Sequence, residues 1–465
     1  MEEITAGKYV PPRRVVHLGK IFPSVEILSC RSFSDLKGAP PLLSYLQTLF
    51  PLLARSGATD LLVEYEDMFP FSGPLANVSA RNAFTVQEIA ELLQTARDNN
   101  LTVIPLVQTF GHMEWILKLE KFKHLREESS SPQSICPSRE GSLKLVRLLL
   151  SQIMEVHKDS THVHIGCDEV YQLGQCERCL EKVNRINGKS GQKHYYNYRS
   201  LFLDHVKTVA SFVNSKGKSP VMWDDMLRNM PRPEVRQSGL GPLVEVMVWC
   251  YESNIDTFID HTTWRLYAEL FRGVWAAGAF KGATGERQYV PDIQHHVRNQ
   301  LSWLLVMQRE NDYSKISPVK FSGLVLTGWA RYDHFAVLCE LLPVAVPSLV
   351  INLVVVSLAG LTFPVSRRIH NLLGCDNIKM LISLEELRRN GQQWDMTRCD
   401  FPGVQVRINI SVNQFELSSK VFSLISKFAL HSSEVDTLHH TVRDKSAWMS
   451  AWNIKSYLSF PSIRL

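Results

Sequence analysis

The feature that most constrains the fold of this chain is a regular alternation between two apolar patterns. Short β-branched runs recur at residues 59–66, 101–108, 161–166, 219–225, 243–252, 271–282 and 321–333, and an eighth is expected near the start of the chain. Longer stretches of helical spacing separate them, at residues 85–100, 142–157, 198–217 and 293–311. This alternation predicts βα units packed around a parallel sheet.

The number of these units indicates a barrel rather than an open sheet. Eight strand–helix units over roughly 350 residues are typical of a (β/α)8 TIM barrel. An open dinucleotide-binding sheet would carry a GxGxxG turn after its first strand, and the sequence has none there. We therefore expect an α/β fold, with a catalytic barrel over residues 1–370 and a C-terminal, mostly helical extension of unknown role over residues 371–465.

Charge and cysteine usage narrow the partners and the location. The formal net charge is +5 over 465 residues without a long basic run, so nucleic acid is not an expected partner. The N-terminus lacks an apolar core of signal-peptide length, which predicts a cytoplasmic or nuclear protein. The nine cysteines are scattered, and the lone CxxC of Cys176 and Cys179 lacks the second ligand pair that a zinc site needs. We therefore expect reduced structural thiols and no metal.

Chemically distinctive side chains stand where the predicted strands end. In a (β/α)8 barrel these ends lie on one face, which carries the active site. The candidates are Glu64, His112, Asp168, Glu169, Trp223, Asp224, Trp249, Tyr251, Trp275, Trp329, Arg331 and Tyr332. A single tryptophan at such a position is more often packing than site. Several tryptophans beside carboxylates favour a sugar pocket, because indoles stack on the apolar ring face and acids bind hydroxyls.

The stretch HVHIGCDE ends on two adjacent carboxylates, Asp168 and Glu169. Ordinary glycoside hydrolysis places two carboxyl groups on opposite sides of the scissile bond, a geometry that neighbours in sequence reach only awkwardly. A different division of labour suits them. Glu169 would act as general acid, and Asp168 would hold a 2-acetamido group whose oxygen attacks the anomeric carbon. His164, inside the strand, is expected to satisfy a buried hydrogen bond.

The segment HIGCDE resembles the H-x-G-x-D-E signature of family 20 glycoside hydrolases, the β-N-acetylhexosaminidases. Supporting stretches between about residues 35 and 345 are DLKGAPP, EYEDMFPF, QTFGHMEW, MWDDM, AFKGA and TGWARYDH. The resemblance implies exo-acting, retaining, substrate-assisted removal of terminal non-reducing N-acetylhexosamine from glycoconjugates, without metal or cofactor. It favours N-acetylgalactosamine over N-acetylglucosamine. A homodimer is left open.

The same resemblance implies roles for individual residues. Asp168 would bind the acetamido group and Glu169 would do the acid/base work. Trp223, Trp249 and Trp329 would line the sugar subsite. His112 is similar to the family's loop histidine, whereas Tyr251 and Tyr332 compete for the hydroxyl that contacts the acetamido oxygen.

Two segments depart from the family pattern. Residues 19–34 stand between a strand-like VVHL and DLKG, which would be nearly continuous in relatives. We expect this atypical insert to impair barrel closure and its deletion to stabilise the protein. The uncharged stretch at residues 341–363 is long enough to span a membrane, but we favour the last barrel helix. If this insert and the altered C-terminal tail spoil barrel closure or turnover, the rival function is a catalytically impaired sugar-binding or interaction protein.

Overall fold

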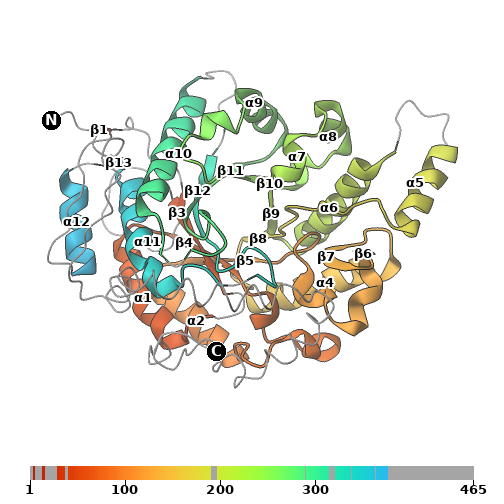
Figure 1. Ribbon diagram of the computed structural model, residues 1–465, viewed down its shortest axis with the longest axis horizontal. Helices are drawn as coiled ribbons and strands as arrows, with labels where there is room; N and C mark the ends of the chain where they lie inside the picture. The colour runs from red at the N-terminus through yellow and green to blue at the C-terminus, as the bar shows by residue number, and fades with distance from the viewer. Residues whose placement is uncertain are drawn as a thin grey trace.

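The computed structural model describes residues 4–5, 13–15, 29–36, 40–189, 196–288, 290–313, 319, 321–336, 338–361 and 363–374. At its centre lies a closed barrel of parallel strands surrounded by helices (Figure 1). In order around the barrel, the strands are β2 (Arg13–Val15), β3 (Ser29–Asp35), β4 (Asp60–Glu64), β5 (Thr102–Leu106), β8 (His162–His164), β9 (Ser219–Trp223), β10 (Glu245–Trp249), β11 (Val274–Lys281) and β12 (Phe321–Gly328). Strand β12 pairs with β2 and closes the circle. The predicted α/β, TIM-like barrel is confirmed, but the described ring has nine strands instead of the expected eight, because the short β2 lies between β12 and β3.

Helices connect the strands and cover the outside of the barrel. The longer ones are α1 (Leu43–Arg55), α2 (Val86–Asp98), α4 (Glu140–Val156), α6 (Tyr198–Ser215), α9 (His261–Leu270), α10 (Ile293–Tyr313) and α11 (Leu342–Ser357). Helix α2 shows why such a segment is helical. The Thr85 hydroxyl accepts the Glu88 N–H at 3.1 Å, the Glu88 carboxylate accepts the Thr85 N–H at 2.8 Å, and the two bonds form a capping box. Its buried residues Ile89, Leu92 and Ala96 then place one apolar face on the barrel.

Shorter elements decorate the barrel rim and its ends. Helix α3 (Glu114–Leu117) and an antiparallel hairpin of β6 (Arg126–Glu128) and β7 (Ser131–Ile135) lie between β5 and α4. Helix α5 (Glu177–Lys189) follows β8, and α7 (Asp225–Arg228) and α8 (Arg232–Ser238) follow β9. Strand β1 (Ile4–Thr5) pairs with β13 (Gly360–Leu361), which precedes α12 (Phe363–Leu373). The hairpin contacts the loop after β8 through Gln133, and that loop leads directly into α5.

The interpretation of residues 19–34 as an obstacle to barrel closure is wrong for the part that the structure describes. Residues 29–35 form β3, which pairs in parallel with β4 from Arg31 opposite Asp60 to Asp35 opposite Glu64. The short β2 lies between β12 and β3. The end of the supposed insert is therefore a barrel strand, and deleting residues 19–34 would remove most of it. Residues 19–28 lie outside the described residues.

The apolar stretch at residues 341–363 supplies the last barrel helix, as expected. Helix α11 packs against α10, β11 and β12, and its residues from Pro343 to Ser357 are all buried. Pro343 stands in the first turn, where a helix has no use for its N–H. Among the described helices, none combines the length and the apolarity that a membrane crossing requires. The predicted C-terminal extension lies, after Gly374, outside the described residues.

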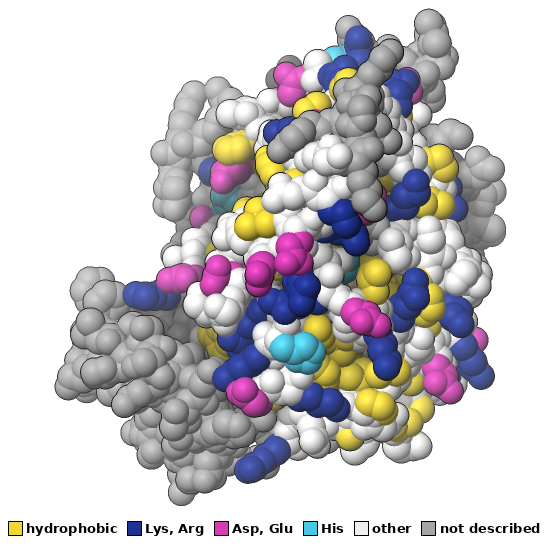
Figure 2. Space-filling model, turned by 90° about the vertical axis from the view of Figure 1, so that its right-hand side faces the viewer, with side chains coloured by type: hydrophobic (Ala, Val, Ile, Leu, Met, Phe, Trp, Pro, Cys, Tyr) yellow, Lys and Arg dark blue, Asp and Glu magenta, His cyan; other side chains and the backbone are white. Residues whose placement is uncertain are grey.

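Charged side chains are mixed on the face drawn in Figure 2. Lys and Arg side chains lie among Asp, Glu and apolar side chains on that face rather than in one continuous basic field.

Candidate active site

The loop after β8 holds the two adjacent carboxylates in an unusual backbone conformation. Gly166, Cys167 and Glu169 have φ values of 66°, 74° and 50°. A residue with a side chain rarely adopts positive φ, at a cost on the order of 1 kcal/mol or more, so surrounding contacts must enforce it. A Cβ at position 166 would also overlap the Gln108 side chain, which makes glycine necessary there.

Three contacts from other elements fix this loop. The Thr109 hydroxyl donates to the Ile165 carbonyl at 2.6 Å. The Gln133 side-chain amide, on β7, donates to the Glu169 carbonyl at 2.8 Å. The Glu169 N–H donates to Asp225 Oδ2 at 2.9 Å. Glu169 is thus held through its backbone from two sides, and its side chain is directed by separate contacts.

His112 bridges the carboxylate pair. Its Nε2 lies 3.1 Å from Glu169 Oε2 and 3.7 Å from Asp168 Oδ2. His112 itself has a φ of 50°, on the loop after β5. The Tyr171 hydroxyl donates to the other Glu169 oxygen, Oε1, at 2.7 Å. Sequence reasoning named His112 but missed Tyr171, whose proximity depends on the turn that follows Glu169.

The two carboxyl groups differ in burial and therefore in acidity. The Asp168 side chain is 10% exposed, and burial raises the pKa of its carboxyl, with Glu169 adding to the rise and His112 opposing it. The Glu169 side chain is 33% exposed. The hydrogen bond with His112 lowers the pKa of Glu169, helped by the one from Tyr171 and opposed by partial burial. Neighbours in sequence thus occupy different environments.

Asp225, rather than the predicted Asp224, belongs to this site. Its two oxygens accept the Glu169 N–H and, at 3.1 Å, the Trp249 indole N–H. Burial, together with the charge of Asp168, raises the pKa of Asp225 to about 7. Sequence reasoning had no signal to choose between the two aspartates of MWDDM.

Asp224 instead anchors the base of the following helix. Its fully buried carboxylate accepts two hydrogen bonds from the Arg228 guanidinium, at 2.6 and 2.7 Å, and one from the Tyr267 hydroxyl at 3.0 Å. Its carboxylate oxygens are thus occupied by protein donors, and Arg228 in turn donates to the Trp249 carbonyl. The prediction that Asp224 binds substrate is therefore not supported by its placement.

Three of the four predicted tryptophans gather beside the acid pair. Trp223 is buried, with its ring 4.5 Å from that of His164 and 5.9 Å from that of Trp329. Trp249 stacks on Tyr251 with ring centroids 5.3 Å apart, and the Trp329 indole N–H donates to the Tyr251 hydroxyl at 2.9 Å. Trp249, Tyr251 and Trp329 are partly exposed, so their rings can contact a ligand.

The remaining candidates lie elsewhere or are otherwise engaged. Trp275 is the second residue of β11, at the opposite end of that strand from the site, and its buried indole N–H donates to Glu245 at 2.8 Å. The buried Arg331 binds Glu66 at 3.1 Å. Tyr332 is exposed, and its hydroxyl accepts the Gly285 N–H at 2.9 Å. Glu64, at the end of β4, is buried and lines a small cavity with Gln108 and Trp115.

This arrangement can perform acid/base chemistry on a ring-shaped polar ligand. A buried carboxyl, an accessible carboxyl, an imidazole between them and partly exposed aromatic rings meet at the C-terminal ends of barrel strands, where such folds place their active sites.

Comparison with known proteins identifies relatives. The profile of the glycosyl hydrolase family 20 catalytic domain matches residues 47–261. The chain is 39% identical to hexosaminidase D of Homo sapiens over 431 residues, which are 92% of this chain and 81% of that protein. It is 42% identical to hexosaminidase D of Bos taurus over 348 residues, 74% of this chain and 96% of that protein.

Solved structures agree on the fold. A crystal structure of a β-N-acetylhexosaminidase superposes with a TM-score of 0.54 at 13% identity, covering 79% of this chain and 78% of that chain. A mutant β-hexosaminidase of Streptomyces plicatus with bound GlcNAc gives 0.53 at 12% identity, with 76% of this chain and 70% of that chain covered. Similarity at this level supports the barrel architecture alone.

Proposed function

Because this chain belongs to glycosyl hydrolase family 20, we propose that it is an exo-acting β-N-acetylhexosaminidase that works by retaining, substrate-assisted catalysis. Its substrate would be a glycoconjugate with a terminal, non-reducing N-acetylhexosamine. The observation that carries the mechanistic part is the unequal carboxylate pair. Asp168 is buried and Glu169 is accessible, although the two are adjacent and share one histidine.

Asp168 fits the role of partner for the acetamido group. Its Oδ1 is buried and, by distance and angle, has no hydrogen-bond partner within the described part of the chain, although the Gln108 side chain lies near enough to favour the charged carboxyl. A buried acceptor without a donor is costly, on the order of 1–3 kcal/mol, so a ligand that supplies an N–H gains what the free protein lacks. The N–H of a 2-acetamido group is such a donor.

The proposed reaction then has two steps. In the first, the acetamido carbonyl oxygen attacks the anomeric carbon while Glu169 gives a proton to the departing glycosidic oxygen. The resulting oxazolinium ring is positively charged, and Asp168 stabilises it through the ring N–H. In the second step, Glu169 takes a proton from water, which attacks the same carbon and reopens the ring. Two inversions leave the β configuration unchanged.

The acid role requires Glu169 to carry a proton when substrate is bound. In the free enzyme, hydrogen bonds from His112 and Tyr171 favour the charged carboxylate and lower its pKa. A sugar that covers Glu169 removes water from a side chain that is otherwise one-third exposed, and desolvation raises a carboxyl pKa. Substrate binding would thus prepare the acid.

The test is an assay of the purified protein on paired chromogenic β-N-acetylgalactosaminide and β-N-acetylglucosaminide, with the matching 2-hydroxyl glycosides as controls. We expect turnover of both acetamido substrates, with the galactosaminide preferred, and rates lower by orders of magnitude on the 2-hydroxyl compounds. The galactosamine preference rests on sequence resemblance and depends on one hydrogen bond to the 4-hydroxyl. Equal rates with and without the acetamido group would disprove substrate assistance.

The same assay addresses the rival function, a sugar-binding or interaction protein without turnover. That alternative assumes a barrel spoiled by residues 19–34 and by the altered C-terminal tail. The described part of residues 19–34 instead forms strand β3, whereas the tail after Gly374 lies outside the described residues. Binding of the sugar without hydrolysis would favour the rival. A cytoplasmic or nuclear location and a homodimeric state stay predictions, which fractionation of cells and light scattering can test.

A further inference from the structure

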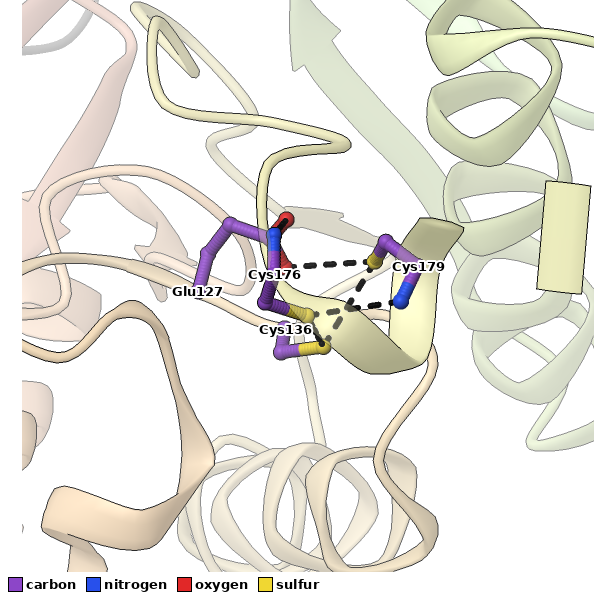
Figure 3. A group of neighbouring side chains, drawn as sticks. All are labelled: Glu127, Cys136, Cys176 and Cys179. Atoms are coloured by element: carbon purple, nitrogen blue, oxygen red, sulfur yellow. Dashed lines mark hydrogen bonds between the residues drawn. The ribbon is translucent and has the colours of Figure 1, made fainter. Parts of the chain in front are cut away.

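A cluster of thiols lies beside the active-site loop, away from the acid pair. Cys136 follows β7, and Cys176 and Cys179 flank the start of α5. The Cys136 Sγ lies 3.3 Å from the Cys176 Sγ and 3.6 Å from the Cys179 Sγ (Figure 3). The fold thus supplies the third sulfur that the lone CxxC lacked in the sequence, from a position forty residues earlier in the chain than Cys176.

A carboxylate completes the group. Glu127, on β6, is buried, and its Oε2 lies 3.2 Å from the Cys179 Sγ. Its other oxygen, Oε1, accepts the backbone N–H groups of Gln175 at 2.8 Å and Cys176 at 3.1 Å. One oxygen is therefore fixed by the backbone and the other is directed at the sulfurs. All four ligand atoms lie within 4.8 Å of one another.

These separations match the edges of a zinc tetrahedron. With Zn–S bonds of about 2.3 Å and a Zn–O bond of about 2.0 Å, tetrahedral ligands stand about 3.8 Å apart for two sulfurs and about 3.5 Å apart for sulfur and oxygen. The observed distances of 3.3, 3.6 and 3.2 Å are shorter by a few tenths of an ångström. A small outward movement of the side chains would admit the ion.

The surroundings also suit thiolates. The Cys179 N–H points to the Cys176 Sγ at 3.4 Å, so the CxxC turn already directs a donor at one sulfur. The Ser138 hydroxyl lies 3.1 Å from the Cys179 Sγ. Donors of this kind orient metal ligands and stabilise their charge. A set of three thiolates selects zinc over magnesium or calcium, which prefer oxygen.

We propose that Cys136, Cys176, Cys179 and Glu127 bind one structural zinc ion. All four ligand positions come from the protein, so the site has no place for a substrate and differs from a catalytic centre. Binding would release the thiol protons to solvent, and the ion would join the β6–β7 hairpin to the beginning of α5.

A zinc ion between the β6–β7 hairpin and α5 would also restrict the catalytic loop. The hairpin carries Gln133, whose amide holds the Glu169 carbonyl at 2.8 Å. Residues 169–176 connect Glu169 to Cys176, so the segment that starts at the proposed acid ends at a zinc ligand. Zinc would therefore fix both neighbours of the loop that carries the proposed acid, as a positioning element rather than a catalytic one.

A second buried group, Glu66, Asp67 and His334, also brings metal-binding atoms together, but it is neutralised by protein cations. Lys118 contacts Asp67 at 3.1 Å and Arg331 contacts Glu66 at 3.1 Å. An added cation there would meet two positive charges. The thiol cluster has no such cation among the partners described above.

The experiment measures metal content and does not depend on enzymatic activity. The full chain would be produced with added zinc under reducing conditions, dialysed without chelator, and analysed by inductively coupled plasma mass spectrometry. We expect one zinc per chain in the wild type and in the control Cys250→Ser, which changes a buried thiol outside the cluster. We expect Cys136→Ser and Cys176→Ser to lose it, with affinity reduced by about 100-fold or more, since outer contacts alone account for about 10- to 100-fold.

A second measurement covers the case in which the serine variants fail to fold. Cobalt exchanged into the wild type should give thiolate charge-transfer bands and visible bands of tetrahedral intensity, and Glu127→Gln should alter the visible bands while keeping the thiolate bands. Substoichiometric zinc in the wild type, zinc retained by both serine variants, or cobalt without thiolate bands would overturn the proposal. So would a Cys136–Cys176 disulfide in zinc-free protein isolated under reducing conditions.

Discussion

The same substitution, Asp→Asn, can be compared at two adjacent positions. Asp225 binds the proposed acid Glu169 through its backbone, whereas Asp224 binds Arg228. In Asp225→Asn the side chain keeps one oxygen acceptor where the carboxylate offers two. The wild-type oxygens accept the Glu169 N–H at 2.9 Å and the Trp249 indole N–H at 3.1 Å, so one of these partly buried donors loses its protein partner. An unsatisfied buried donor costs about 1–3 kcal/mol. If that cost falls on the transition state, kcat/KM drops by about 5- to 150-fold.

Asp224→Asn is the matched control. It removes the charge that pairs with Arg228 at 2.6 Å, while its own side chain touches neither Glu169 nor Trp249 and only Arg228 connects it to the Trp249 carbonyl. Breaking a buried ion pair costs about 3–5 kcal/mol, which should appear as a lower Tm and not as a lower kcat of the folded fraction. Steady-state kinetics on a chromogenic N-acetylhexosaminide and thermal denaturation separate the two effects. An unchanged kcat/KM in Asp225→Asn, or equal catalytic losses in both variants, would refute this division.

The raised pKa of Asp225 predicts that the stability of the protein depends on pH. Because burial raises the pKa of Asp225 from 3.8 to about 7, the folded state holds its proton more tightly than the unfolded state. The stability from this group is fully present below pH 3.8 and is lost as the pH rises through about 7. Asp225→Asn removes this titration. The difference in unfolding free energy between wild type and variant should therefore change between pH 4 and pH 7, and a constant difference would contradict the burial argument.

Further predictions concern the catalytic residues and the N-terminal strand. Glu169→Gln should lose about 10²- to 10⁴-fold on alkyl glycosides and much less on activated aryl glycosides, because only poor leaving groups need the acid; equal losses would contradict its role. Asp168→Asn should lower kcat chiefly and weaken binding of a thiazoline mimic of the intermediate, by about 3–4 kcal/mol at most; unchanged thiazoline affinity would count against it. Tyr171→Phe removes the hydrogen bond at 2.7 Å, so the pKa of Glu169 should rise and the alkaline limb of the kcat/KM profile should move to higher pH; an unmoved limb would exclude this contact. Deleting residues 29–34 should abolish soluble expression because it removes most of β3, and a stable product would show that the strand is dispensable.

Local patterns were sufficient to predict a TIM-like barrel and to locate the adjacent carboxylates Asp168 and Glu169 at the end of a strand. A parallel barrel strand is buried on both faces, as β11 shows at all of its positions, so it appears in sequence as a continuous apolar run. Capping residues such as Thr85 mark a helix start within a few positions of the chain. The carboxylates Asp168 and Glu169 follow directly after such a run. Each of these inferences uses residues that are close in sequence, which is where sequence patterns are informative.

The wrong predictions concern side-chain direction, strand boundaries and contacts between residues that are distant in sequence. Strand β9 ends at Trp223, and the turn into α7 then decides which aspartate points to the site, so the alternation of a strand no longer applies. The uninterrupted apolar run of β11 gives no sign of where the strand begins and ends, so Trp275, its second residue, was predicted at the C-terminal end by mistake. Residues 29–34, the end of the predicted insert, lack an apolar run, and only their pairing with β4 makes them part of a strand. Cys136 and Cys176 meet only through the tertiary fold.

The strained loop explains why this site needs so much support from distant residues. Cys167 and Glu169 both have positive φ, which for such residues costs on the order of 1–3 kcal/mol each. This backbone conformation directs the Asp168 side chain into a buried environment and the Glu169 side chain into a more exposed one. The proposed roles of the two carboxyl groups depend on this difference in burial. It persists only while Gln133 and Asp225 hold Glu169 through its carbonyl and N–H. Gln133 is carried by the hairpin that the proposed zinc site fixes. Loss of the metal should therefore lower the rate through the position of Glu169 before it unfolds the barrel.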